Sequence, residues 1–199
     1  MRKVSLVGTV VAALLLATGG FANATTIDFG NLVGANEDPY AGSSQDGFTV
    51  TPALGNWFEA HLFGNPVPSI FAGPIGSPSV SAIVVTSAVP FTFDQVDLSC
   101  NNGESCQFGF DSFFGGIETP LGVGNVAGAF GTFNTELNSS PLVVMDTLVI
   151  TMAPDADTTS MNLDNIVVEA VAQPVPEPAT ILLLGSALTG LALKRKRRS

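Results

Sequence analysis

Hydrophobic positions along the middle of the chain recur in short runs that are separated by Gly, Pro, Asn and Asp. Runs of this length between turn residues are typical of β-strands. From residue 25 to residue 173 the pattern contains no convincing helix. The clearest strand-like runs are Phe48–Thr51, Trp57–Phe63, Ser79–Ser87, Phe91–Leu98, Gln107–Phe113, Val123–Phe133, Leu142–Met152 and Asn162–Val171.

Short strands in this number predict an all-β fold, an antiparallel two-sheet sandwich of the jelly-roll kind. Alternation supports it, because Phe91 and Phe93 alternate with Asp94 and Asp97 once a bulge is allowed between them. Residues 142–152 are denser in apolar side chains, which predicts a central strand buried on both faces. No internal repeat is visible, and the segment has the size of one domain.

The N-terminal segment has the three parts of a secretory signal peptide. Arg2 and Lys3 supply the positive start, residues 4–17 are mostly apolar, and a small-x-small cleavage site ends at Ala24. The apolar part is too short to span a bilayer permanently. We therefore expect signal peptidase to cut after Ala24; an uncleaved anchor helix is the alternative.

The C-terminal segment consists of a Pro-Glu-Pro motif, an apolar stretch and a basic cluster. Pro176, Glu177 and Pro178 precede the uncharged residues 179–193, and Lys and Arg fill residues 194–198. A proline and an acid at this position favour the start of an apolar helix. That helix would be about 22 Å long, shorter than the roughly 30 Å hydrocarbon core. The basic cluster marks the cytoplasmic end, so the body is expected outside the inner membrane.

These three parts in this order resemble the PEP-CTERM sorting domain of Gram-negative bacteria. The resemblance implies recognition by an exosortase, a membrane enzyme similar to cysteine proteases, and a cut near Pro176, Glu177 and Pro178. It also implies a transient anchor in the inner membrane, followed by delivery to the cell surface or the exopolysaccharide matrix. A plain single-span anchor is the alternative. The chain thus divides into a signal peptide (1–24), a sandwich body (25–173) and a sorting tail (174–199).

Charge is distributed unevenly along the chain. All seven basic residues lie in the two terminal segments, and all seventeen acidic residues lie from Asp28 to Glu177. Residues 25–193 therefore carry seventeen negative side chains and no Lys or Arg. Nucleic acid is excluded as a partner, because its binding depends on Lys and Arg contacts to phosphates. Net repulsion keeps such a body soluble.

The two cysteines suit an exported protein, because disulfides persist in oxidising compartments. We predict one disulfide between Cys100 and Cys106 that clips a loop. Free thiols are the alternative. A metal site would need further His or Cys ligands, and the spacing differs from the C-x-x-C of redox proteins.

Residues suited to catalysis are sparse in the body. His61 is the only histidine, so a Ser-His-Asp or Cys-His arrangement has a single available base. No G-x-S-x-G elbow surrounds a serine, and no Lys or Arg is available as nucleophile or oxyanion partner. We predict that the protein is not an enzyme. A secreted glycoside hydrolase that uses a pair of the many carboxylates is the alternative.

One predicted strand offers a face for a carbohydrate. If residues 57–63 are extended, Trp57, Glu59, His61 and Phe63 share one face. An aromatic ring beside polar side chains suits a sugar, so we expect Trp57, Glu59 and His61 to form a weak carbohydrate-binding face. The alternative places Trp57 in the core, where most aromatic residues of this Phe-rich chain belong.

Carboxylates without neighbouring cations also suit Ca²⁺, which takes about six to eight oxygen ligands. The Asp-Ala-Asp sequence at 155–157 begins like an EF-hand loop but lacks the glycine and the closing glutamate of that motif. The EF-hand is therefore excluded, and any Ca²⁺ site must be of another kind.

A second resemblance bears on that site. It rests on three short motifs of the body, which are Ile27-Asp28-Phe29, Phe91-x-Phe93-Asp94 and Leu163-Asp164-Asn165-Ile166-Val167-Val168. They are similar to a sandwich domain common among proteins with this sorting tail, which distantly resembles carbohydrate-binding jelly rolls. The resemblance implies a structural Ca²⁺ held by Asp164 together with Asp28 or Asp46. In the alternative, Asp164 only makes a turn or caps a strand.

Together these patterns predict an exported, non-enzymatic protein of the cell surface or exopolysaccharide matrix. Signal peptidase and an exosortase-type enzyme are its expected processing partners, and extracellular polysaccharide is its expected ligand. A carboxylate-dependent hydrolase and a purely structural surface protein are the two alternatives.

Overall fold

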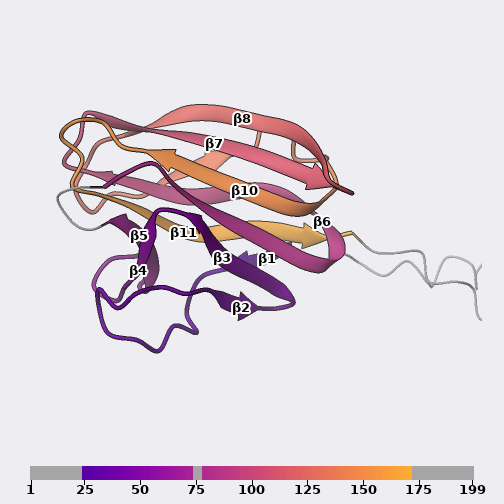
Figure 1. Ribbon diagram of the computed structural model, residues 1–199, viewed down its shortest axis with the longest axis horizontal. Helices are drawn as coiled ribbons and strands as arrows, with labels where there is room; N and C mark the ends of the chain where they lie inside the picture. The colour runs from indigo at the N-terminus through magenta and orange to yellow at the C-terminus, as the bar shows by residue number, and fades with distance from the viewer. Residues whose placement is uncertain (1–23, 74–77, 172–199) are drawn as a thin grey trace, which may run out of the picture.

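A computed structural model describes residues 24–73 and 78–171, which form eleven β-strands and no helix (Figure 1). The expected terminal helices, and the sorting motif Pro176, Glu177 and Pro178, lie outside these residues. In the part of the chain that is described, no helix has the length and apolarity needed to span a bilayer.

One layer of the sandwich is built around the first half of β6 (Ser81–Asn101). That half pairs with β3 (Phe48–Leu54) on one edge and with β10 (Met145–Ala153) on the other. The layer continues from β10 through β7 (Ser105–Phe114) to β8 (Ile117–Ala127), and β2 (Ser43–Gln45) lies beside β3. All of these pairs are antiparallel, as the sequence predicts.

The second layer is built around the second half of β6. That half pairs with β11 (Ser160–Ala170) and with the short strand β9 (Asn134–Leu137). The other edge of β11 pairs with β5 (Ser69–Gly73) and then β1 (Ala24–Ile27), and β4 (Asn56–Ala60) flanks β5. β6 thus runs from one layer into the other, and hydrogen bonds connect all eleven strands.

The core lies between the two layers and is rich in phenylalanine. Phe93 from β6 and Phe110 from β7 meet edge to face with ring centroids 5.0 Å apart. Phe48 and Phe91 meet in the same way at 5.3 Å. Each of these rings is buried, and burying one stabilises the fold by about 2–3 kcal/mol. The predicted all-β antiparallel sandwich is therefore confirmed.

Individual strands differ from the prediction where a strand continues through a bend, where its ends are shifted, or where it has only a few residues. The two predicted runs at 79–87 and 91–98 are one continuous strand, β6. The run predicted at 123–133 is shifted toward the N-terminus, because residues 128–133 lie beyond the end of β8. The strands β1, β2, β5 and β9 are each of three to five residues and were not predicted. β10 is central, as expected, but it buries one face rather than two.

The two ends of β11 lie at opposite ends of the sandwich. At about 3.3 Å per residue, the strand from Ser160 to Ala170 spans about 33 Å. Beyond Ala170, Val171 N donates to Pro90 O over 2.8 Å. The arrowhead of β11 lies beside the bend of β6 in Figure 1. We call this end of the sandwich the tail-proximal end. We call the opposite end, at Ser160, the cleft end, after the cleft that is described in the next subsection.

The predicted disulfide is present. Cys100 and Cys106 are bonded, with 5.7 Å between their Cα atoms, and both are fully buried. Cys100 is near the end of β6 and Cys106 is near the start of β7, so the bond closes the hairpin between these strands. It lies at the cleft end, because Cys100 pairs with Met161 of β11.

Replacing Cys100 and Cys106 together by Ala tests this disulfide. The variant loses the restriction that the bond places on the unfolded chain, so its unfolding free energy should fall by about 2 kcal/mol. Urea denaturation measures the change. Wild-type protein under reducing conditions is the control and should unfold at the same midpoint as the variant. If neither midpoint moves, the bond does not stabilise the fold.

Candidate functional site

A cleft of about 250 Å³ opens at the cleft end of the sandwich. Strands and loops that are far apart in the sequence contribute to it. Its aromatic lining is Phe63, Phe71 and Phe130, and its polar lining is Asn36, Asn101, Thr159, Ser160 and Asn162. The cleft therefore combines apolar walls with uncharged hydrogen-bonding groups.

The aromatic side chains differ in how much of each ring is free. Phe63 and Phe130 meet edge to face, with centroids 5.7 Å apart. Phe130 is 63% exposed and Phe63 is 38% exposed, so both rings offer surface to a ligand. Phe71 is buried and stacks on Phe58 at 5.4 Å, which fixes its position.

The polar lining is held by a buried amide. Asn101 Nδ2 donates to Ser160 Oγ and to Asn162 Oδ1, each over 2.9 Å. Asn101 Oδ1 accepts from Gly131 N over 2.9 Å. Asn162 is only 3% exposed, yet its Nδ2 donates to no acceptor in residues 24–73 and 78–171. Asn162 lines the cleft, so this amide is available to an acceptor on a bound molecule.

The loop that carries Phe130 is fixed against the disulfide hairpin. Gly128 N donates to Glu104 O, and Ala129 N donates to Cys100 O, each over 2.9 Å. A Cβ at Gly128 would lie 1.7 Å from Gly103 O, so only glycine allows this approach.

Asp155 ties the next segment to the same hairpin. Its carboxylate accepts from Thr158 Oγ1 over 2.6 Å and from the backbone N–H groups of Glu104 and Ser105 over 2.6 and 2.9 Å. These hydrogen bonds, that from Thr158 above all, lower the pKa of Asp155 to about 2. The turn that precedes Thr159 and the lining residue Ser160 is thereby held at the hairpin.

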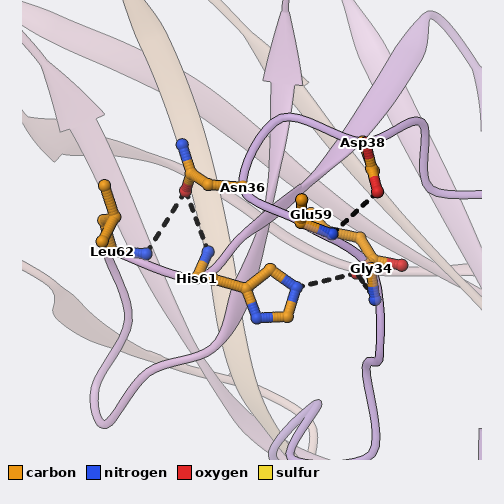
Figure 2. A network of polar contacts seen from close by, with 7 residues as sticks. Gly34, Asn36, Asp38, Glu59, His61 and Leu62 are labelled. Atoms are coloured by element: carbon orange, nitrogen blue, oxygen red, sulfur yellow. Dashed lines mark hydrogen bonds and ion pairs between the residues drawn. The ribbon is translucent and has the colours of Figure 1, made fainter.

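Glu59 and His61 hold the loop that leads to Phe63. Glu59 Oε2 accepts from Gly34 N over 2.9 Å and lies 2.8 Å from His61 Nε2. Asn36 Oδ1 accepts from His61 N and Leu62 N over 3.0 and 3.3 Å, as Figure 2 shows. Glu59 and His61 therefore lie together, as predicted, but they bind the protein's own loop.

Trp57 does not belong to an exposed ligand face, and that part of the prediction is wrong. Its side chain is 3% exposed, and its Nε1 donates to Leu54 O over 3.1 Å. The strand ends at Ala60, so the alternation assumed through Phe63 fails. Leu62, which would lie on the opposite face of such a strand, is exposed. The alternative that places Trp57 in the core is confirmed.

Asp164 takes part in a buried network rather than an open site. Its two oxygens accept from Asn65 N over 2.6 Å and from Asn165 N over 2.8 Å. Asp97, its partner across the strands, accepts from Asn65 Nδ2, Asn165 Nδ2 and Thr135 Oγ1. Burial above all, helped by the nearby carboxylates of Asp97 and Asp28, raises the pKa of Asp164 to about 7, although its two backbone hydrogen bonds lower it.

The calcium site stays a prediction. Asp28 lies near enough to Asp164 to affect its pKa, but Asp28 itself accepts from Gly30 N and Gln45 Nε2. Asp46 lies in the turn between β2 and β3. Within the described ranges, no three His, Cys, Asp or Glu side chains are grouped closely enough to hold a metal. Asn165 has a φ of 44° at a shift in the strand register, so the segment also makes the irregular turn offered as the alternative.

Sequence patterns alone did not point to most of the cleft. Phe63 lies on a segment that the sequence pattern marks, but the pattern does not single out Phe71, Phe130, Asn101 or Asn162. The best available signal for Phe130 is its position between Gly128 and Gly131, which is typical of a turn. Nothing local marks the two asparagines, because strand pairing brings them together.

The C-terminal tail matches a known family model. Residues 174–198 match the PEP-CTERM protein-sorting motif. The molecule is thus an all-β sandwich that carries a C-terminal sorting signal. It is a PEP-CTERM motif-containing protein, and this motif marks an exported protein.

The body resembles several solved sandwiches at low identity. The K1 cleaved adhesin domain of Lys-gingipain from Porphyromonas gingivalis W83 is 11% identical, with a TM-score of 0.48 over 75% of this chain and 99% of that one. CBM29_1, a family 29 carbohydrate-binding module from Piromyces equi, is 8% identical, with a TM-score of 0.46 over 76% and 93%. The family 32 module of C. perfringens NanJ, solved with galactose, is 15% identical, with a TM-score of 0.42 over 62% and 97%.

A search of curated proteins found no match.

The raised pKa of Asp164 predicts a pH-dependent stability. The folded state keeps a proton that the unfolded state, with an ordinary pKa of 3.8, releases near pH 4. The stabilisation is complete below that pH and is lost as the pH rises toward 7. Relative to Asp164→Asn, the wild type should therefore lose at most about 4 kcal/mol of unfolding free energy across this window.

Urea denaturation from pH 4 to pH 8 measures this difference. Asp111→Asn, on β7 in the other layer, is the matched control for the loss of one carboxylate. A wild-type-minus-variant difference that does not change with pH would contradict the assignment to Asp164.

Proposed function

We propose that this protein is an exported, non-enzymatic protein of the cell surface or exopolysaccharide matrix, and that its cleft binds a carbohydrate. The observation that carries the proposal is the cleft itself. Phe63 and Phe130 present ring surface beside the Asn162 amide, whose Nδ2 donates to no acceptor among the described residues. Trp57 has no part in binding.

The chemistry of the cleft suits a saccharide. A sugar ring has apolar C–H faces that pack on aromatic rings, and hydroxyl groups that donate and accept hydrogen bonds. Asn162 Nδ2 offers a donor, while Ser160 and Asn36 offer further uncharged polar groups. A few placed polar groups in a mainly apolar site are the usual basis of small-ligand specificity.

The charge of the body favours an uncharged saccharide. Residues 25–193 contain no Lys or Arg, so no cationic side chain is available to pair with a uronate, sulfate or phosphate group. The seventeen acidic residues, most of them in the body, would repel an anionic polymer unless divalent cations bridged the two. A neutral glycan needs no cationic partner and is not repelled by the carboxylates.

The hydrolase alternative has little support in the described residues. Asp97 and Asp164 are a close carboxylate pair, but both are buried, so neither reaches a glycosidic bond. Glu59 is engaged by His61 and Gly34 N. Among the described residues that line the cleft, none carries a carboxylate. Glycoside hydrolysis needs two accessible carboxyl groups on either side of the scissile bond.

The tail provides the route to the surface. We propose that an exosortase-type enzyme of a Gram-negative bacterium cuts near Pro176, Glu177 and Pro178, after transient anchoring in the inner membrane. The cleft end of β11 lies about 33 Å from the end that leads to this tail. Attachment through the tail would therefore present the cleft away from the point of attachment.

Replacing Phe130 by Ala tests the cleft. Loss of this exposed ring removes stacking surface, so affinity for a neutral exopolysaccharide from the producing bacterium should fall by about tenfold, or about 1.4 kcal/mol. Isothermal titration calorimetry on the purified protein measures it, and Phe63→Ala should act in the same direction.

Phe114→Ala is the matched control, because Phe114 is an exposed Phe of the tail-proximal end. It should bind like the wild type. Equal affinity of the Phe130 and Phe114 variants would contradict binding in the cleft. Stronger binding to a uronate-rich polymer than to a neutral glycan would contradict the proposed ligand class.

Intact-mass measurement of the protein from the bacterial surface and medium tests the proposed processing. We expect a chain that begins at Thr25 and ends near residues 176–178, because both terminal signals are removed. Additional mass would identify what replaces the tail. A chain that still ends at Ser199 would mean that the tail is an ordinary anchor.

A further inference from the structure

Three uncharged segments meet at the tail-proximal end of the sandwich. They are Ala88-Val89-Pro90 in the bend of β6, Phe114-Gly115-Gly116-Ile117 at the tip of the β7–β8 hairpin, and Pro141-Leu142-Val143-Val144 before β10. None contains a charged residue, although the body carries many carboxylates.

Hydrogen bonds and strand pairing place these segments next to one another. Val171 N donates to Pro90 O over 2.8 Å, and Phe91 pairs with Met145 at the start of β10. Gly115 N donates to Asp146 Oδ2 over 2.8 Å, which joins the hairpin tip to β10. In Figure 1, the end of β7, the start of β10, the bend of β6 and the end of β11 lie together.

The apolar side chains of this end are exposed. Ile117 is 74% exposed and Leu142 is 88% exposed. Phe114, Val89 and Val144 are also exposed, so five large apolar side chains gather here. Single exposed apolar residues need no explanation, but a group of them at one end marks a contact surface.

The position of the tail identifies what this surface meets. Seven residues, 172–178, separate Val171 from the apolar stretch 179–193. Even fully extended, they let residue 179 lie no more than about 26–29 Å from Val171. While the apolar stretch lies in a bilayer, the tail-proximal end must therefore stay close to the surface of that bilayer.

We propose that the tail-proximal end is a membrane-contact surface, and that Phe114, Ile117 and Leu142 enter the interface of the bilayer that holds the tail. The occupant is a zwitterionic phospholipid surface, because the acidic body would be repelled by anionic lipids. The proposal rests on the proposed passage of the tail through the membrane. Carbohydrate binding in the cleft is independent of it.

Quenching by brominated lipid tests the contact. The full chain, uncleaved at the tail, is reconstituted in phosphatidylcholine vesicles with brominated acyl chains. Tryptophan is introduced by Ile117→Trp, and Phe130→Trp at the cleft end is the matched control. Wild-type protein gives the background of Trp57, which is buried.

We expect the Ile117→Trp protein to lose emission with brominated lipid, while the Phe130→Trp protein and the wild type do not. Equal emission at both positions would overturn the proposal. Failure of the full chain to float with the vesicles would also overturn it, and would count against the tail anchor rather than against the cleft. A blue shift at position 117 that grows with protein concentration in the absence of lipid would assign the surface to a second copy of the chain instead.

A second measurement separates insertion from simple tethering. A Leu142→Trp reporter is compared with the same reporter carrying Phe114→Ser and Ile117→Ser. Less quenching in the triple variant is expected, because the hairpin tip no longer favours the interface. Unchanged quenching would mean that the tether alone holds the body near the lipid, and the proposed surface would be wrong.

Discussion

The body contains no Lys or Arg, so its carboxylates must be satisfied by N–H and O–H donors of the protein or by water. Several of these carboxylates accept hydrogen bonds from loops and so hold the loops in place. Asp155 gathers two backbone N–H groups of the disulfide hairpin, and Glu59 gathers Gly34 N and His61. Asp164 accepts from Asn65 N in the same way, but its burial also raises its pKa and so favours the protonated carboxyl group. Carboxylates thus act here as acceptors that connect distant segments, in place of ion pairs with Lys or Arg.

Several of these hydrogen bonds position the loops that line the cleft. The loop with Phe63 is held by Asn36 and by the network around Asp164, and the loop with Phe130 is held by Asn101 and the hairpin. Neither loop belongs to a strand, so its position depends on these polar contacts rather than on the sheet. The apolar core determines the sandwich, and the acceptor groups determine where its two exposed rings meet.

The sandwich and the disulfide could be predicted from sequence, because alternation and two cysteines in an exported chain are local signals. The division into strands was less accurate where a strand has only three to five residues, as in β2 and β9, or where β6 continues through a bend. The predicted ligand face is wrong because other parts of the fold cover Trp57 on its side of β4. This burial depends on tertiary packing, which no local sequence pattern indicates. Asn101 and Asn162 could not be found, because their meeting depends on the register of β6 against β11.

The direction of β11 has a mechanical consequence. The strand begins at the cleft and ends at Ala170, four residues before the sorting motif begins at residue 174, so a pull on an anchored C-terminus acts along its axis. It is hydrogen-bonded on both edges, to β6 on one side and to β5 and β1 on the other. Because antiparallel hydrogen bonds lie perpendicular to the strands, such a pull shears many of them together instead of opening them one after another. A molecule held at its C-terminus and gripping a polymer at its far end would therefore resist extension in the direction in which flow would stretch it.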